Sequence, residues 1–153
     1  MRLMTFSPDD TLAIMTSNGI LLYNVESRSF VSTLSFLRST AMAFSPYSTH
    51  LAAGNSDSTV YLWDIRGIEA SSPSSNKQAG GEVTALALFR DYSRVACGFE
   101  YGAVELWETG SLANQPIAAH THHSKEVTTL GCSPDGWRFA SGSNDWDCHL
   151  MGW

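Results

Sequence analysis

The tetrapeptide Thr84-Ala85-Leu86-Ala87 reveals an internal repeat, because similar runs lie 44 residues before and after it. Upstream the chain reads Thr40-Ala41-Met42-Ala43, and downstream it reads Thr128-Thr129-Leu130-Gly131. The same offset relates three further sets of positions: Leu51, Val95 and Phe139; Gly54, Gly98 and Gly142; and Leu62, Leu106 and Leu150. A fixed period of about 40–45 residues is typical of a repeat architecture.

A shorter copy of the repeat stands at the N-terminus, where Phe6-Ser7-Pro8 corresponds to Phe44-Ser45-Pro46 and Tyr23 corresponds to Trp63. We therefore divide the chain, as one domain, into repeats at about 1–38, 39–82, 83–126 and 127–153. Within each repeat, short β-like runs alternate with turn residues, which predicts an antiparallel meander. Asn18-Gly19 predicts a two-residue hairpin turn with positive φ at both positions.

Length and charge restrict the class of protein. The chain has 153 residues, the size of one domain, and carries 9 Lys+Arg against 15 Asp+Glu for a net charge of -6. Without a basic cluster we expect no nucleic-acid partner, and without an apolar run of about 20 residues we expect no membrane span. The three cysteines suggest no disulfide framework, so we expect a reducing compartment. We expect a cytoplasmic location, with the nucleus as the alternative.

Four short strands in a repeat of this length predict a blade of a β-propeller. The chain resembles the WD-repeat β-propellers in Ser-Pro-Asp-Gly at 133–136, in Ala-Ser-Gly-Ser at 140–143, and in Asp57 six residues before Trp63-Asp64. The resemblance implies an all-β fold of four-stranded antiparallel blades, here in an incomplete ring of about three and a half blades. It covers nearly the whole chain except a low-complexity loop at about 67–80, which we expect to replace the outer strand of the second repeat.

The resemblance also implies a buried network in each blade, made by a loop His, a strand Ser, a hairpin Asp and a Trp of the third strand. Six positions carry over to this chain: Asp57 and Trp63 in the second repeat, Trp107 in the third, and His123, Ser141 and Asp145 in the fourth. Met151 stands where the fourth Trp would be, and Tyr101 stands at the Asp position of the third repeat. We therefore expect no complete network in any blade, and stability that comes mainly from packing.

Two tryptophans fall outside the periodic positions. Trp137 follows a Pro-Asp-Gly turn, and Trp146 lies in the predicted hairpin turn of the fourth repeat. Exposed tryptophans in turns are candidate anchors for a partner, although packing against a neighbouring loop is the structural alternative. Tyr101 lies in the matching hairpin of the third repeat. We predict a contact face for a protein or peptide partner made of Tyr101, Trp146, His122 and Glu126.

Catalytic signatures are missing, because the sequence has no nucleophile elbow, phosphate-binding loop, zinc-protease helix or dinucleotide fingerprint. His123, Ser141 and Asp145 include the residue types of a catalytic triad, yet each falls on a periodic structural position. We therefore expect neither an enzyme nor a cofactor.

The alternative is a metal-binding or hydrolytic site around His120–His123. Its candidate zinc ligands are the imidazoles and nearby thiols: His120, His122, His123, His149, Cys132 and Cys148. Against that alternative, the repeat places Cys97, Cys132 and Cys148 at core positions, where small thiols pack as apolar groups.

Four repeats are fewer than the roughly seven blades of WD-type rings, and the fourth repeat lacks an outer strand. We expect either that the chain is a segment of a longer propeller or that copies of it complete a ring by association. Open blade edges predict self-association in the second case. The function that follows from the resemblance is a non-catalytic protein–protein interaction scaffold that presents propeller-face loops.

Overall fold

The structure, a computed structural model, describes residues 3–35, 39–67, 75–78, 80–110 and 115–152, which form strands and turns. The first two sheets are β1 (Met4–Phe6), β2 (Thr11–Thr16), β3 (Gly19–Asn24) and β4 (Ser29–Leu34), then β5 (Ser39–Phe44), β6 (His50–Asn55), β7 (Thr59–Asp64) and β8 (Ser75–Gln78). The third is β9 (Val83–Leu88), β10 (Arg94–Phe99), β11 (Val104–Glu108) and β12 (Ala118–His120), and the fourth is β13 (Val127–Cys132), β14 (Arg138–Ser143) and β15 (Cys148–Gly152). We call these sheets blades 1 to 4.

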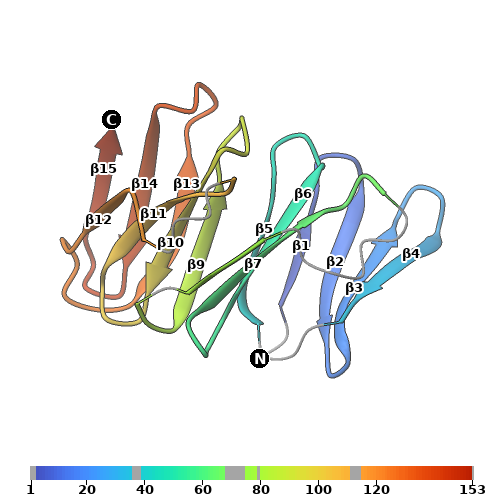
Figure 1. The fold of residues 1–153 in the computed structure, drawn as a ribbon, viewed down its shortest axis with the longest axis horizontal. Helices are drawn as coiled ribbons and strands as arrows, with labels where there is room; N and C mark the ends of the chain where they lie inside the picture. The colour runs from blue at the N-terminus through green and yellow to red at the C-terminus, as the bar shows by residue number, and fades with distance from the viewer. Residues whose placement is uncertain (1–2, 36–38, 68–74, 79, 111–114, 153) are drawn as a thin grey trace.

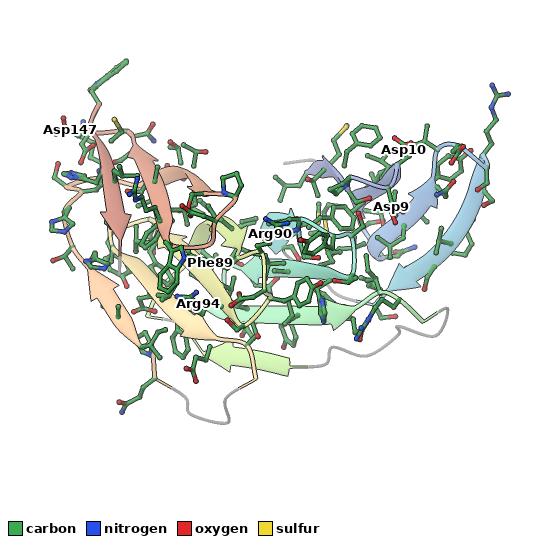
Figure 2. All side chains as sticks on the ribbon, turned by 90° about the horizontal axis from the view of Figure 1, so that it is seen from above. Asp9, Asp10, Phe89, Arg90, Arg94 and Asp147 are labelled. Atoms are coloured by element: carbon green, nitrogen blue, oxygen red, sulfur yellow. The ribbon has the colours of Figure 1, made fainter. Side chains whose placement is uncertain are left out.

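Each blade is an antiparallel meander in which neighbouring strands in the chain pair with each other. The blades stand side by side in chain order (Figure 1). Seen from above they follow an arc, with blade 1 at one end and blade 4 at the other (Figure 2). The predicted all-β fold of propeller blades in an incomplete ring is confirmed.

The same two contacts join blades 2, 3 and 4 in sequence. A Cβ on Gly54 would lie only 2.3 Å from Val83 Cγ1, and a Cβ on Gly98 would lie 2.6 Å from Val127 Cγ1. Glycine at these two positions therefore lets the first valine of the next blade enter a notch in the strand. Beside each notch, a threonine hydroxyl donates to the carbonyl of that valine: Thr40 to Val83, and Thr84 to Val127 at 2.6 Å.

Aromatic side chains fill the core where two blades meet. Trp63 and Trp107 are both buried, and small residues of the neighbouring inner strands pack around them. Alanine-rich inner strands such as β9 fit between two sheets because neither face meets water. Tyr23, at the matching position of blade 1, is only half-buried, since no described residue packs as a blade against that side of blade 1.

Two local predictions differ from the structure. The low-complexity stretch at 67–80 was expected to replace the outer strand of the second repeat, but Ser75–Gln78 forms β8 and pairs with β7. Backbone pairing with an existing edge stabilises this strand despite its polar sequence. Residues 68–74 and 79 of this stretch lie outside the described residues. The first hairpin forms, but its loop is Ser17-Asn18, and positive φ falls on Gly19 alone.

Blade 4 has three strands in the described part of the chain, as expected, with β15 at its edge. None of the described residues forms a helix long and apolar enough to cross a membrane.

Candidate functional site

Three turns and loops meet at one end of blades 3 and 4. They are the β10–β11 turn, the loop before β13 and the β14–β15 turn, which carry the predicted contact residues Tyr101, His122, Glu126 and Trp146. The β10–β11 turn lies directly against the loop, because a Cβ on Gly102 would lie 2.2 Å from His123 O. We call this region the Trp146 end.

The base of the Trp146 end is a buried hydrogen-bonded chain of three side chains. His123 Nδ1 lies 3.2 Å from both carboxylate oxygens of Asp145, and His123 Nε2 lies 2.8 Å from Ser141 Oγ. The carboxylate can only accept, so Nδ1 donates to it and, in the neutral ring, Nε2 accepts from the Ser141 hydroxyl. The network therefore ties the loop before β13 to the last hairpin.

Asp145 also accepts hydrogen bonds from backbone amides. Ser124 N donates to Oδ2 at 2.8 Å and Asp147 N donates to Oδ1 at 3.0 Å. Burial alone would raise the pKa of Asp145, but these amides, together with His123 and Ser143, outweigh it and lower the pKa to about 2. The carboxylate is thus ionised at neutral pH and fixes both the loop and the turn.

The other positions implied by the resemblance make contacts within their own blades. Met151, at the Trp position of blade 4, is buried against Phe139. Trp107 Nε1 donates to Glu105 Oε2 at 3.1 Å, and the ring of Trp63 stacks on Tyr61 with centroids 5.9 Å apart. Asp57 accepts from the backbone N of Thr59 at 3.1 Å and is exposed.

Trp146 projects from the last hairpin and is 95% exposed. Its φ of 72° lies in the left-handed region, which costs a bulky residue about 1–2 kcal/mol. The corresponding positions of blades 2 and 3 are also left-handed, with Ser58 at 68° and Gly102 at 91°. The repeat therefore imposes this backbone conformation, and only blade 4 places a large aromatic residue on it.

The remaining predicted contact residues lie at the same end but differ in exposure. Tyr101 is 48% exposed and stacks on Phe99, with ring centroids 5.4 Å apart. Partial burial, together with Glu105 and Glu100, raises the pKa of Tyr101. Glu126 is exposed and accepts from Asn144 Nδ2 at 3.0 Å.

His122 belongs to a run of imidazole rings. Its ring centroid lies 5.6 Å from that of His120 and 5.2 Å from that of His149, which in turn lies 4.7 Å from His123. His122 is exposed and the flanking His120 and His149 are half-buried. In the described part of the chain, no group of three or more His, Cys, Asp or Glu side chains has a geometry that could hold a metal ion.

The three cysteines differ in burial, although the repeat places all of them at core positions. Cys97 is buried and burial raises its pKa, and burial raises the pKa of Cys132 to about 12. Cys148 is exposed, so its prediction as a core residue is wrong. Its side of blade 4 has no neighbouring blade among the described residues.

A second cluster of side chains, which the sequence did not predict, lies at the opposite end of blades 2 to 4 and is centred on Arg90. Arg90 Nε donates to Tyr47 Oη at 2.5 Å and Arg90 Nη1 donates to Pro134 O at 3.3 Å, so one side chain bridges the turns of three blades. Figure 2 labels Arg90 near the middle of the arc. Beside it lies a cavity of about 480 Å³ partly lined by Trp137. The repeat period could have revealed this cluster, because Pro46, Arg90 and Pro134 occupy equivalent positions 44 residues apart.

Comparisons with known proteins agree with this architecture. The family model "WD domain, G-beta repeat" matches residues 28–64 and 114–153. The chain is 33% identical over 108 residues to a guanine nucleotide-binding protein subunit beta of Solanum tuberosum, covering 67% of this chain and 28% of that protein. It is 31% identical over 121 residues to protein Rae1 of Drosophila melanogaster, covering 74% of this chain and 33% of that protein. The chain thus spans about a third or less of these curated relatives.

A solved structure shows the same fold. A chain in the crystal structure of the mitotic checkpoint complex superimposes with a TM-score of 0.81 at 23% identity, over 97% of this chain and 48% of that chain. WD-repeat proteins generally act as protein-interaction scaffolds and are typically non-enzymatic. Four meander blades at a 44-residue period, the His123–Ser141–Asp145 network and the matching family model together lead to one conclusion: the chain belongs to the WD-repeat family of β-propellers.

Proposed function

We propose that this chain is a non-catalytic interaction scaffold that holds a protein or peptide partner at the Trp146 end, with Trp146 as the anchor and Tyr101, His122 and Glu126 around it. One observation carries the proposal: a tryptophan that is 95% exposed occupies a left-handed turn position where the neighbouring blade has glycine. Backbone strain that persists at an exposed position supports a functional role for the residue.

Rigid support beneath an exposed anchor favours recognition, because little conformational entropy is lost on binding. Asp145, the residue before Trp146, is held by His123 and by the amides of Ser124 and Asp147. The turn is therefore fixed before a partner arrives, and the indole presents its faces to solvent.

Charge at this end indicates the chemistry of the partner. Three exposed carboxylates belong to the turns and the loop, Glu100, Glu126 and Asp147, whereas Lys125 is the exposed lysine among them. An indole beside acidic groups favours a cationic or apolar side chain, since a Lys or Arg over a tryptophan face gains cation–π attraction. We therefore expect a partner segment that combines an apolar residue with Lys or Arg.

The burial of the His123–Ser141–Asp145 network supports a structural role over a hydrolytic one. Ser141 is only 2% exposed and His123 is also buried. A nucleophile must reach the substrate carbonyl, and the Ser141 hydroxyl has no such access in this arrangement.

Peptide selection tests the proposal without a known partner. A random peptide library displayed on phage would be selected against the native chain and against Trp146→Ala, with Trp137→Ala as the matched control from the opposite end. We expect basic and apolar peptides that bind the native chain and Trp137→Ala but not Trp146→Ala. Peptides that bind all three proteins equally would show that the Trp146 end is not the site.

A further inference from the structure

The junctions between blades join two unlike faces. Toward the next blade, blades 2 and 3 present cross-strand rows of mostly small residues: Ala41, Gly54 and Val60 with Ala43, Ala52 and Leu62, and then Ala85, Gly98 and Val104 with Ala87, Ala96 and Leu106. The receiving face of the following blade carries larger side chains. In blade 3 these are Leu86, Leu88, Val95, Cys97 and Trp107, which pack with the small face of blade 2.

Blade 4 ends the arc with a small-residue face that nothing described covers. Its rows are Thr129, Gly142 and Cys148, and Gly131, Ala140 and Leu150. Gly142 is half-buried and the other five are exposed, with Leu150 at 71%. A Cβ on Gly142 would meet only Thr129 Cγ2, at 3.0 Å, whereas the corresponding notches at Gly54 and Gly98 are filled by valines.

The hydrogen bond that a threonine makes to the next blade is also missing at the end of blade 4 within the described residues. Thr84 Oγ1 lies 3.2 Å from Gly98 O in its own blade and 2.6 Å from Val127 O in the next. Thr128 Oγ1 lies 3.2 Å from Gly142 O, and no second acceptor occurs among the described residues. Blade 4 thus carries half of a blade junction.

Blade 1 begins the arc with the complementary large-residue face. Its rows are Phe6, Leu12 and Tyr23, and Met4, Ile14 and Leu21. The counterparts of Met4 and Phe6 in blade 2 are Met42 and Phe44, which pack toward blade 1. The same direction in blade 1 leads away from blade 2, and Met4 is 66% and Phe6 60% exposed.

We infer that these two faces are the two halves of one interface, and that the partner is a second copy of this chain. Blade 4 of each copy packs its small face on the large face of blade 1 of the other copy, so a twofold arrangement makes both junctions together. The junctions of blade 2 with blade 3 and of blade 3 with blade 4 pair a small face with a large face in the same way, which supports this occupant. Apolar residues are exposed on both faces, and exposed apolar patches of this kind mark interaction surfaces.

The extent of the arc fits a closed pair. The chain superimposes on 48% of a WD-repeat chain in the mitotic checkpoint complex, so two copies match the length of that chain. The two ends of the arc lie at opposite sides in Figure 2, where Asp10 labels blade 1 and Asp147 labels blade 4. The sequence leaves open whether a longer propeller or association completes the ring, and the experiment below tests association. This inference does not depend on the partner proposed for the Trp146 end.

Sedimentation equilibrium of the full chain under reducing conditions tests the inference. We expect a discrete mass twice the 16.7 kDa of one chain. Phe6→Lys places a cation on the large face and Ala140→Glu places an anion on the small face, and both residues are exposed. Each variant alone should be monomeric, because both junctions of its pair are damaged. An equimolar mixture should regain the dimer, because one junction is then native and the other joins opposite charges.

Matched controls carry the same charges in turns away from both faces. Ser17→Lys lies in the β2–β3 turn, and Trp137→Glu precedes β14, and both residues are exposed. These variants should remain dimers. Far-UV circular dichroism would confirm that each variant keeps the β-sheet signal of the native chain.

A second readout needs no substitution. Cys148 lies on the small face and is exposed in the single chain, so its thiol should react with a maleimide at high dilution and be protected as the concentration rises. Mass spectrometry of the digested protein assigns the label to Cys148 rather than Cys97 or Cys132. A native chain that is a folded monomer with Cys148 equally reactive at all concentrations would overturn the inference. Open-ended polymers, or charge variants with an unchanged dimer mass, would overturn it as well.

Discussion

His123 Nδ1 lies 3.2 Å from both carboxylate oxygens of Asp145, although 22 residues separate the two in the chain. The side chains of both residues are almost fully shielded from water. The contact fixes the loop before β13 to the last hairpin, and with Ser141 it forms the three-residue network of blade 4. The position of Trp146 therefore depends on this pair.

Removal of the imidazole should destabilise the chain. His123→Ala leaves the buried Ser141 hydroxyl without its hydrogen-bond partner, and a buried unsatisfied polar group costs about 1–3 kcal/mol. Urea unfolding followed by circular dichroism should show a lower midpoint with an unchanged slope. His122→Ala, which changes an exposed ring in the same loop, should leave the midpoint nearly unchanged. Equal midpoints for native chain and His123→Ala would contradict a structural role for the network.

The pKa of Asp145 predicts a specific loss of stability in acid. Its value of about 2 in the folded chain lies below the ordinary 3.8, so the ionised group stabilises the fold at pH values above about 4. The difference in unfolding free energy between native chain and Asp145→Asn should be full above about pH 5 and shrink as the pH falls toward 2. Urea unfolding at several pH values measures this difference. A difference that stays constant from pH 6 to pH 2 would contradict the assigned cause.

The threonine contacts between blades give a matched pair of substitutions. Thr84→Val removes the hydroxyl that donates to Val127 O across a junction, and should cost about 1 kcal/mol. Thr128→Val removes a hydroxyl with an acceptor in its own blade and should cost less. Both changes keep the side-chain shape, and unfolding would be compared at concentrations where the chain is monomeric. Equal losses for the two variants would show that the contact between blades adds no stability.

The backbone of Trp146 predicts a gain in stability when the side chain is removed. Its φ of 72° suits glycine, the residue that occupies the matching position 102. Trp146→Gly should therefore raise the free energy of unfolding by about 1 kcal/mol, while Trp146→Ala should leave the strain in place. Thermal unfolding checks the order of the three proteins. A less stable Trp146→Gly chain would mean that the indole packs on the fold in solution.

The sequence predicts the fold well because one pattern recurs in register. The glycines at 54, 98 and 142 share a 44-residue spacing, and the structure shows the close approach that requires glycine at the first two. Strand β8 could not be predicted, because Ser75–Gln78 has little strand propensity and is paired by its neighbour β7. The strand propensity of a segment does not show whether the folded chain offers it the edge of a sheet to pair with.

The candidate site was predictable only in part. The period places Tyr101 and Trp146 at one end of the sheets, but it cannot show that Tyr101 stacks on Phe99 and is half-buried. It placed Cys148 in the core, because the repeat assumes a neighbouring blade on every side. The role of Arg90 as a bridge between three turns depends on side-chain reach, which spacing alone does not encode.

The dissociation constant of one selected peptide, measured by calorimetry for the native chain, Trp146→Gly and Trp137→Ala, tests the role of Trp146 as the anchor. We expect Trp146→Gly to weaken binding at least tenfold, which corresponds to about 1.4 kcal/mol, while its fold is as stable as the native one or more so. Trp137→Ala should bind like the native chain. Unchanged affinity for Trp146→Gly would show that Trp146 is not the anchor and place the contact surface elsewhere on the blades.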